Sequence, residues 1–160
     1  MPRTLIIGFG NPDRADDGVA FHVINAVRRH LGQTPLPEDE TGLEELGNTV
    51  DTVFLSQLTP ELADIMKDYG RIFFVDAHVY ENLKPLHCAP VHPEAAGLTF
   101  THHISPAMLL ALLQAIHQCA PPGYLVSLRG HDFDFHRDLS SKTADLIEPA
   151  VRCILAEITA

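Results

Sequence analysis

The segment Arg71–Asp76 (RIFFVD) constrains the fold more than any other part of the sequence. Its centre, Ile72 to Val75, is continuously apolar, and the segment then ends in a carboxylate. A run of this kind, without polar alternation, is typical of a strand that is buried on both faces of a helix-covered sheet. We therefore expect a central strand here that carries Asp76 to the carboxyl end of the sheet.

Strand and helix patterns alternate along the rest of the chain. The other expected strands lie at 4–7, 49–55 and 124–129, with a weaker edge or hairpin strand at 83–92. The expected helices run over 18–31, from Thr59 to Gly70, from Ser105 to about Cys119, and from Ser140 or Ser141 to near the C-terminus. The acidic segment 33–48 is expected to be a loop with at most one helical turn. This order predicts a single domain over residues 1–160, an α/β three-layer sandwich with a mostly parallel twisted sheet and helices on both faces.

Composition excludes several classes of protein. The 160 residues are 46% hydrophobic and 20% charged, which is ordinary for a globular domain and excludes a disordered chain. The net charge of −10 opposes binding to phosphate backbones, so we expect no nucleic-acid partner. Three widely spaced cysteines (Cys88, Cys119 and Cys153) fit neither a disulfide framework nor a cysteine-rich zinc site. Because no signal peptide or membrane span is evident, we expect a cytoplasmic protein without a membrane partner.

The loop after the first expected strand, GFGNPDRADDG at 8–18, is the first candidate site. Its Gly-x-Gly is similar to the start of a dinucleotide-binding fingerprint, but Asp13 occupies the position of the third glycine. Three aspartates in this loop also oppose a pyrophosphate. A nucleotide-binding domain therefore remains only as an alternative interpretation.

Carboxylates occur at two places that the expected topology brings to one edge of the sheet. Asp16 and Asp17 stand at the start of a helix, where one of them is expected to cap free N–H groups while the other faces the cleft. Asp76 ends the apolar strand, where a carboxylate is costly unless it is paired, hydrogen-bonded or metal-bound. A cap or turn role is the alternative for Asp76.

Histidine is abundant, with ten residues, and His102 and His103 precede an expected helix. Either one would complete a set of two carboxylates and one imidazole with Asp17 and Asp76. Such a set suits a divalent first-row metal with open positions. His78 is a further candidate ligand. Because the sequence lacks the GxSxG and HExxH signatures, a metal-activated water is the natural route if the protein is a hydrolase.

On these residues the chain resembles the hydrogenase maturation proteases, endopeptidases that trim the C-terminal extension from the large subunit of nickel-iron hydrogenases. The resemblance rests on GFGNPDRADDGVA at 8–20 and FFVDA at 73–77. QLTPELA at 57–63 and the histidine-bearing THHISP at 101–106 support it. It spans nearly the whole chain.

The resemblance implies that Asp17 and Asp76 are the metal-contacting and catalytic carboxylates. It implies that the metal-binding histidine is His103, with His102 as second choice because the motif slides by one residue. In another register of the family this histidine follows the Ser-Pro pair directly, and that position is Ala107 here. The implied metal is nickel carried by the substrate, and another divalent metal such as zinc or cadmium can occupy the same site.

The implied partner is the hydrogenase large-subunit precursor, and we expect the protein to be a monomer. A non-catalytic nickel-binding accessory protein of the same fold is the alternative function. Two chemical roles stay open, in which the metal polarises the scissile carbonyl or a carboxylate of Asp17 or Asp76 activates water. The charged and aromatic segment 129–140 is interpreted as either a substrate-docking surface or a solvated loop.

Overall fold

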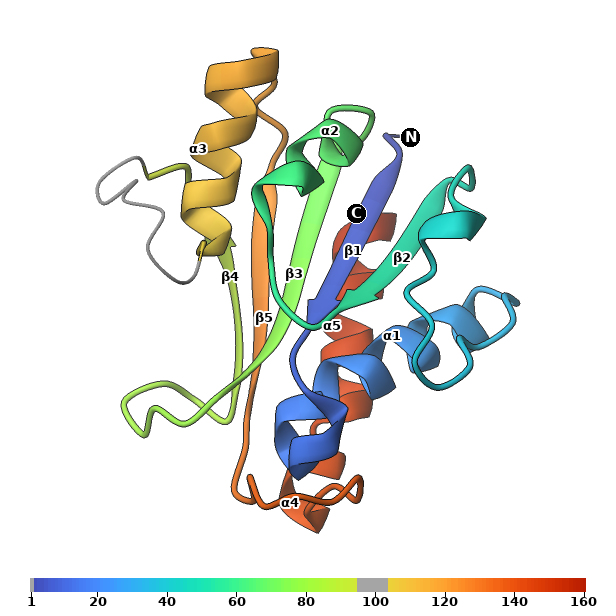
Figure 1. Cartoon of the computed structure of the whole chain (residues 1–160), viewed down its shortest axis with the longest axis vertical. Coiled ribbons are helices and arrows are strands. Elements are labelled where there is room, and N and C mark those ends of the chain that lie inside the picture. The colour runs from blue at the N-terminus through green and yellow to red at the C-terminus, as the bar shows by residue number, and fades with distance from the viewer. Residues whose placement is uncertain (1, 95–103) are drawn as a thin grey trace.

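The computed structural model describes residues 2–94 and 104–160, and these form a sheet of five strands with helices on both faces (Figure 1). The strands are β1 (Thr4–Phe9), β2 (Val50–Leu55), β3 (Arg71–His78), β4 (Leu86–Val91) and β5 (Gly123–Arg129). Their order in the sheet is β2-β1-β3-β5-β4, and only β4, at one edge, runs antiparallel to its neighbour. The predicted three-layer α/β sandwich is therefore confirmed.

Two layers of helix enclose the sheet. The long helices are α1 (Val19–His30), α3 (Pro106–His117) and α5 (Ile147–Thr159). The short ones are η1 (Pro12–Gly18), η2 (Leu43–Glu45), η3 (Pro60–Leu62), α2 (Ala63–Met66) and α4 (Ser141–Ala144). No helix in the described ranges is long and apolar enough to cross a membrane.

The core is divided between the two faces of the sheet, as a doubly covered sheet requires. On one face, Phe73 packs with side chains of α1 and α5. On the other, Phe74 packs with side chains of α2 and α3. Because neighbouring residues of β3 point to opposite faces, its apolar run fills both layers, which confirms that it is a central strand.

Two helix predictions need correction. The expected last helix is broken into α4 and α5, because Pro149 has no N–H to donate and its ring would clash with the carbonyl of Asp145. Thr59 stands at the N-cap position of η3 but its side chain makes no capping hydrogen bond. By contrast, Ser105 and Ser140 cap α3 and α4 through their hydroxyl groups, as expected.

The strand containing Asp76 is longer than predicted. It continues to His78 because β5 pairs with it over Asp76↔Ser127 and His78↔Arg129. Pairing with β1 ends earlier, at Gly8↔Val75. Asp76 therefore lies one residue beyond the last residue of β3 that pairs with β1. In the sheet, β2 lies on one side of β1 and β3 lies on the other. The carboxyl end of β1 is therefore a topological switch point, and α/β sheets form their binding crevices at such points.

Candidate active site

The structure brings Asp17 and Asp76 together at this switch point. Asp17 comes from η1, which directly follows β1, and Asp76 comes from the neighbouring strand β3. Both residues line the same two hollows, together with Phe9, Tyr80 and Pro106. The two carboxylates therefore share one partly apolar crevice.

Gly10 makes the position of Asp17 possible. Its φ of +144° lies in the region that favours glycine, and a Cβ on this residue would lie 2.0 Å from the backbone oxygen of Asp17. The next residue, Asn11, donates its backbone N–H to Oδ2 of Asp17 at 2.9 Å. Any side chain at position 10 would push this loop away from the carboxylate that it orients.

Asp16, the neighbour of Asp17, is fully buried and has a structural role. Its carboxylate accepts hydrogen bonds from the backbone N–H groups of His131, Asp132 and Ser140 at 2.8, 2.9 and 2.8 Å. The hydroxyl groups of Ser140 and Thr143 also donate to it. Burial alone would raise the pKa of Asp16, but these hydrogen bonds outweigh it and lower the pKa to about 2.

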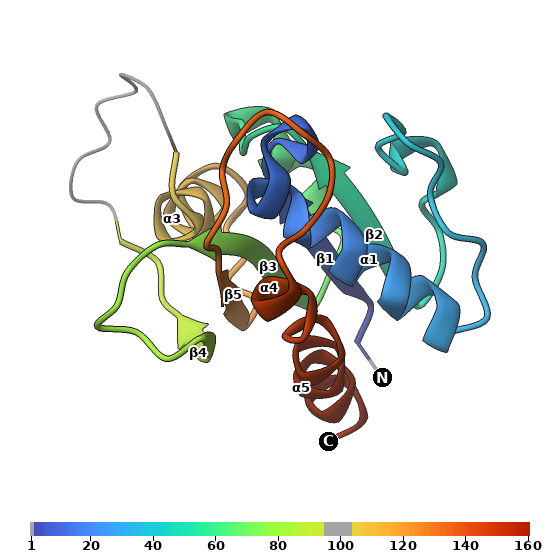
Figure 2. The same cartoon turned by 90° about the horizontal axis from the view of Figure 1, so that it is seen from below.

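The two adjacent aspartates thus divide their roles as the sequence indicated, but the capping part of that prediction is wrong. Asp16 does not cap its own helix, and instead binds the segment 131–143 that follows β5. Figure 2 shows this segment, in orange-red, arching over the start of α1. Residues 130–140 form neither helix nor strand and most of their side chains are exposed, as a solvated loop requires, although the backbone at 131 and 132 is bound to Asp16. A docking role of the exposed side chains stays a prediction.

Asp76 has the opposite electrostatic environment to Asp16. Burial and, to a lesser extent, the negative charge of Asp17 raise its pKa to about 7. The N–H of Ala77, which donates to Oδ1 at 2.8 Å, opposes this rise only in part. A carboxyl group with this pKa exchanges its proton close to neutral pH. Perturbed acids of this kind are frequent at catalytic sites.

The predicted histidine ligands, His102 and His103, lie outside the described residues. Ile104, the next residue in the sequence, lines one of the hollows together with both carboxylates. Within residues 2–94 and 104–160, no group of three or more His, Cys, Asp and Glu side chains is placed to hold a metal ion.

His78 is therefore not a third ligand to the carboxylate pair, contrary to its candidacy. It is buried, and its Nδ1 lies 2.7 Å from Oγ of Ser127. This pairing of two side chains on β3 and β5 holds the imidazole against the sheet.

No protein-family model and no curated protein matches the sequence. Solved structures do match it over nearly its whole length. The hydrogenase maturating endopeptidase HybD of E. coli is 22% identical, with a TM-score of 0.70, over 98% of this chain and 92% of that one. The [NiFe] hydrogenase maturation protease HybD of Thermococcus kodakarensis is 20% identical, with a TM-score of 0.63, over 99% of both chains.

The chain has the fold of the hydrogenase maturation proteases. A further structure of this kind, the [NiFe] hydrogenase maturation protease HycI of Thermococcus kodakarensis KOD1, is 17% identical with a TM-score of 0.63, over 98% of this chain and 91% of that one. The expected architecture is thus confirmed. At sequence identities of 17–22%, the similarity supports the fold but not the activity.

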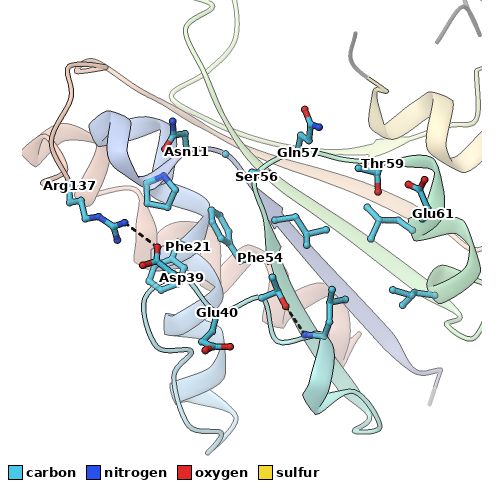
Figure 3. A pocket seen from close by; sticks show the side chains of 17 residues that line it. Asn11, Phe21, Asp39, Glu40, Phe54, Ser56, Gln57, Thr59, Glu61 and Arg137 are labelled. Carbon is cyan, nitrogen blue, oxygen red and sulfur yellow. Dashed lines mark hydrogen bonds and ion pairs between the residues drawn. The ribbon is translucent and has the colours of Figure 1, made fainter. Parts of the chain in front are cut away.

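Sequence reasoning missed a second cavity beside the carboxylates, of about 520 Å³, which we call the side cavity (Figure 3). Its wall includes Glu40 and Glu61, from two segments that are far apart along the chain, and Arg137 from a third. The acidic residues of the 33–48 loop could have predicted the charged part of this cavity, since several carboxylates in one loop indicate a charged surface.

Proposed function

We propose that this protein is an endopeptidase that removes the C-terminal extension of a nickel-iron hydrogenase large-subunit precursor after nickel insertion. The observation that carries the proposal is the placement of Asp17 and Asp76 on neighbouring elements at the switch point, facing one crevice. The shared fold with maturation proteases over nearly the whole chain supports it.

In this proposal the two carboxylates recognise nickel that is bound to the precursor. Carboxylate oxygens and one imidazole nitrogen suit a divalent first-row cation. The imidazole is assigned to His103, with His102 as second choice, because these residues directly precede Ile104, which lines the crevice. An empty crevice with two nearby negative charges repels itself, and a cation on the substrate removes this repulsion. A precursor without nickel should therefore bind more weakly.

The same carboxylates supply the chemistry. Asp76, which exchanges its proton near neutral pH, is suited to take a proton from an attacking water and return it to the leaving amine. Nickel on the substrate can in addition polarise the scissile carbonyl. Neither step needs a serine or cysteine nucleophile of the protein.

Ser127 is the hydroxyl group that most resembles a nucleophile in the crevice, because it contacts His78. Its residue is only 4% exposed, and the contact with the imidazole occupies its hydroxyl, so we assign it to holding His78. We expect Ser127→Ala to process the precursor at nearly the rate of the unmodified protein. A loss of cleavage by a factor of about 1,000 or more would instead identify Ser127 as the nucleophile.

The test is to incubate the purified protein with nickel-loaded and nickel-free precursor and to follow the precursor's C-terminus by mass spectrometry. We expect cleavage of the loaded form alone. Asp17→Asn and Asp76→Asn should abolish it while remaining folded. Asp145→Asn, which removes the same charge from an exposed position, should leave it intact.

The other outcomes distinguish the alternatives. Binding of the loaded precursor without cleavage would favour the non-catalytic nickel-binding accessory protein. Equal cleavage of loaded and nickel-free precursor would place the nickel check elsewhere and leave the carboxylates to act on water alone. Normal processing by both Asn variants would refute the assignment of the site.

A further inference from the structure

The side cavity has an apolar floor. It lies between η1, the end of β2, the η3–α2 turn and the loop that contains Glu40 (Figure 3). The large apolar side chains on its wall are Phe21, Leu43, Phe54, Leu55, Leu62 and Ile65. At about 520 Å³, its volume is in the range of sites that bind ligands of a few hundred daltons. It can therefore hold one or two large apolar side chains.

The rim of the side cavity is acidic. Asp39, Glu40 and Glu61 line it and are exposed to solvent. Its one basic side chain, Arg137, is already neutralised, because it forms ion pairs with Asp39 at 3.1 Å and with Asp13 at 2.8 Å.

Unlike Asp39, the side chains of Glu40 and Glu61 form no ion pair with any residue in the described ranges. Figure 3 shows Glu61 on the side of the cavity opposite to Arg137, with Phe54 between them. Two negative charges of the rim are thus left for a ligand, because the ion pairs of Arg137 are with Asp13, Glu38 and Asp39.

The side cavity adjoins the crevice of the carboxylate pair. Gly10, Ser56 and Gln57 line both the cavity and the hollow that contains Asp17 and Asp76. A chain that lies across the carboxylates and leaves over these three residues enters the cavity directly. An extended peptide advances about 3.3 Å per residue, so a few residues are sufficient for the crossing.

We infer that the side cavity is a substrate subsite, which binds a large apolar side chain and a nearby lysine or arginine in the peptide segment next to the cleaved bond. The apolar floor takes the apolar side chain, and Glu40 and Glu61 take the cation. The same rim excludes phosphates and acidic peptides through like-charge repulsion. The role beside a cleaved bond rests on the proposed peptidase function, whereas the binding chemistry does not.

Binding is tested with short peptides, so that the result does not depend on cleavage. The probe is Ac-Lys-Leu-Phe-Lys-NH2, and its site on the isotope-labelled protein is read from amide chemical shifts. Ac-Glu-Leu-Phe-Glu-NH2 tests the charge preference, and Ac-Lys-Gly-Gly-Lys-NH2 tests the need for apolar side chains. We expect the probe to shift the amide signals of Thr41, Gln57 and Thr59, and the other two peptides to leave them unchanged.

A matched pair of variants tests the two glutamates. The double variant Glu40→Gln/Glu61→Gln should weaken probe binding about three- to tenfold, the effect of losing two exposed charge contacts. Glu148→Gln, at an exposed position of α5 outside the cavity, should not change it. Equal binding by the double variant, or shifts only outside the cavity, would overturn the inference, as would equal binding of the acidic peptide.

Precursor processing separates this inference from the proposed function. If the double variant cleaves a precursor at the unmodified rate and with unchanged KM, the peptidase stands and the subsite is refuted. If the probe binds in the side cavity but no precursor is cleaved, the binding chemistry stands and the peptidase fails.

Discussion

Replacing Asp76 with asparagine should stabilise the folded protein, because the native carboxylate opposes folding. Its pKa rises from 3.8 to about 7 on folding, mainly through burial. A pKa difference of one between the folded and unfolded states corresponds to about 1.4 kcal/mol, so the whole rise corresponds to about 4 kcal/mol above pH 7. Since the side chain keeps part of its contact with solvent, we expect about half of this value, about 2 kcal/mol.

The pH dependence gives the sign of the effect. A carboxyl group whose pKa is raised in the folded state reduces stability once the pH exceeds the pKa of the unfolded chain, and the reduction is complete above the folded pKa. The gain from Asp76→Asn should therefore be full at pH 8, fall to about a quarter at pH 4.5 and vanish at still lower pH.

Urea unfolding of the unmodified protein and of Asp76→Asn at the two pH values measures this gain directly. In thermal unfolding the gain at pH 8 corresponds to a rise of about 4–8 °C in Tm. Asp145→Asn should change the free energy of unfolding by less than about 0.5 kcal/mol. No gain at pH 8, or the same gain at both values, would show that Asp76 is not held in an unfavourable environment.

Three other changes have defined outcomes. In urea unfolding at pH 7, Asp16→Asn should lower the free energy of unfolding by about 3 kcal/mol, because one amide cannot accept all the hydrogen bonds of the carboxylate. The stability that the native Asp16 carboxylate contributes should be complete above about pH 4 and disappear as the pH falls through 2. Gly10→Ala should cost at least about 2 kcal/mol in the same assay, whereas Gly47→Ala, with positive φ but open space, should cost about 1 kcal/mol. Asp17→Asn should lower the pKa of Asp76, seen by NMR titration of the Asp76 carboxyl carbon, and an unchanged pKa would refute their electrostatic coupling.

The sequence predicted the architecture well because its strongest signals are local. The apolar run of β3 and the alternating strands and helices determine the layers, and Asp76 follows the run directly. The break before α5 was also readable, since Pro149 cannot continue a helix from α4. It was missed because the amphipathic pattern runs across it.

The site was less predictable because its parts are distant in sequence. The adjacent aspartates were expected to divide their roles, but the donors that select Asp16 as the buried one lie 115 to 127 residues later. The side cavity is assembled from the loop of Glu40, the turn of Glu61 and the segment of Arg137. Its apolar and acidic parts meet only in the folded chain, so no local pattern shows them together.

The contact between Asp16 and residues 131–143 has a consequence for biosynthesis. Chains grow from the N-terminus, so the loop that carries Asp17 leaves the ribosome before residues 131–143, as do β1, β2 and β3. The groups that bind Asp16 come after β5, 115 to 127 residues later in the chain. A nascent chain can thus pair β1, β2 and β3, three of the five strands, before the contacts between Asp16 and residues 131–143 can form.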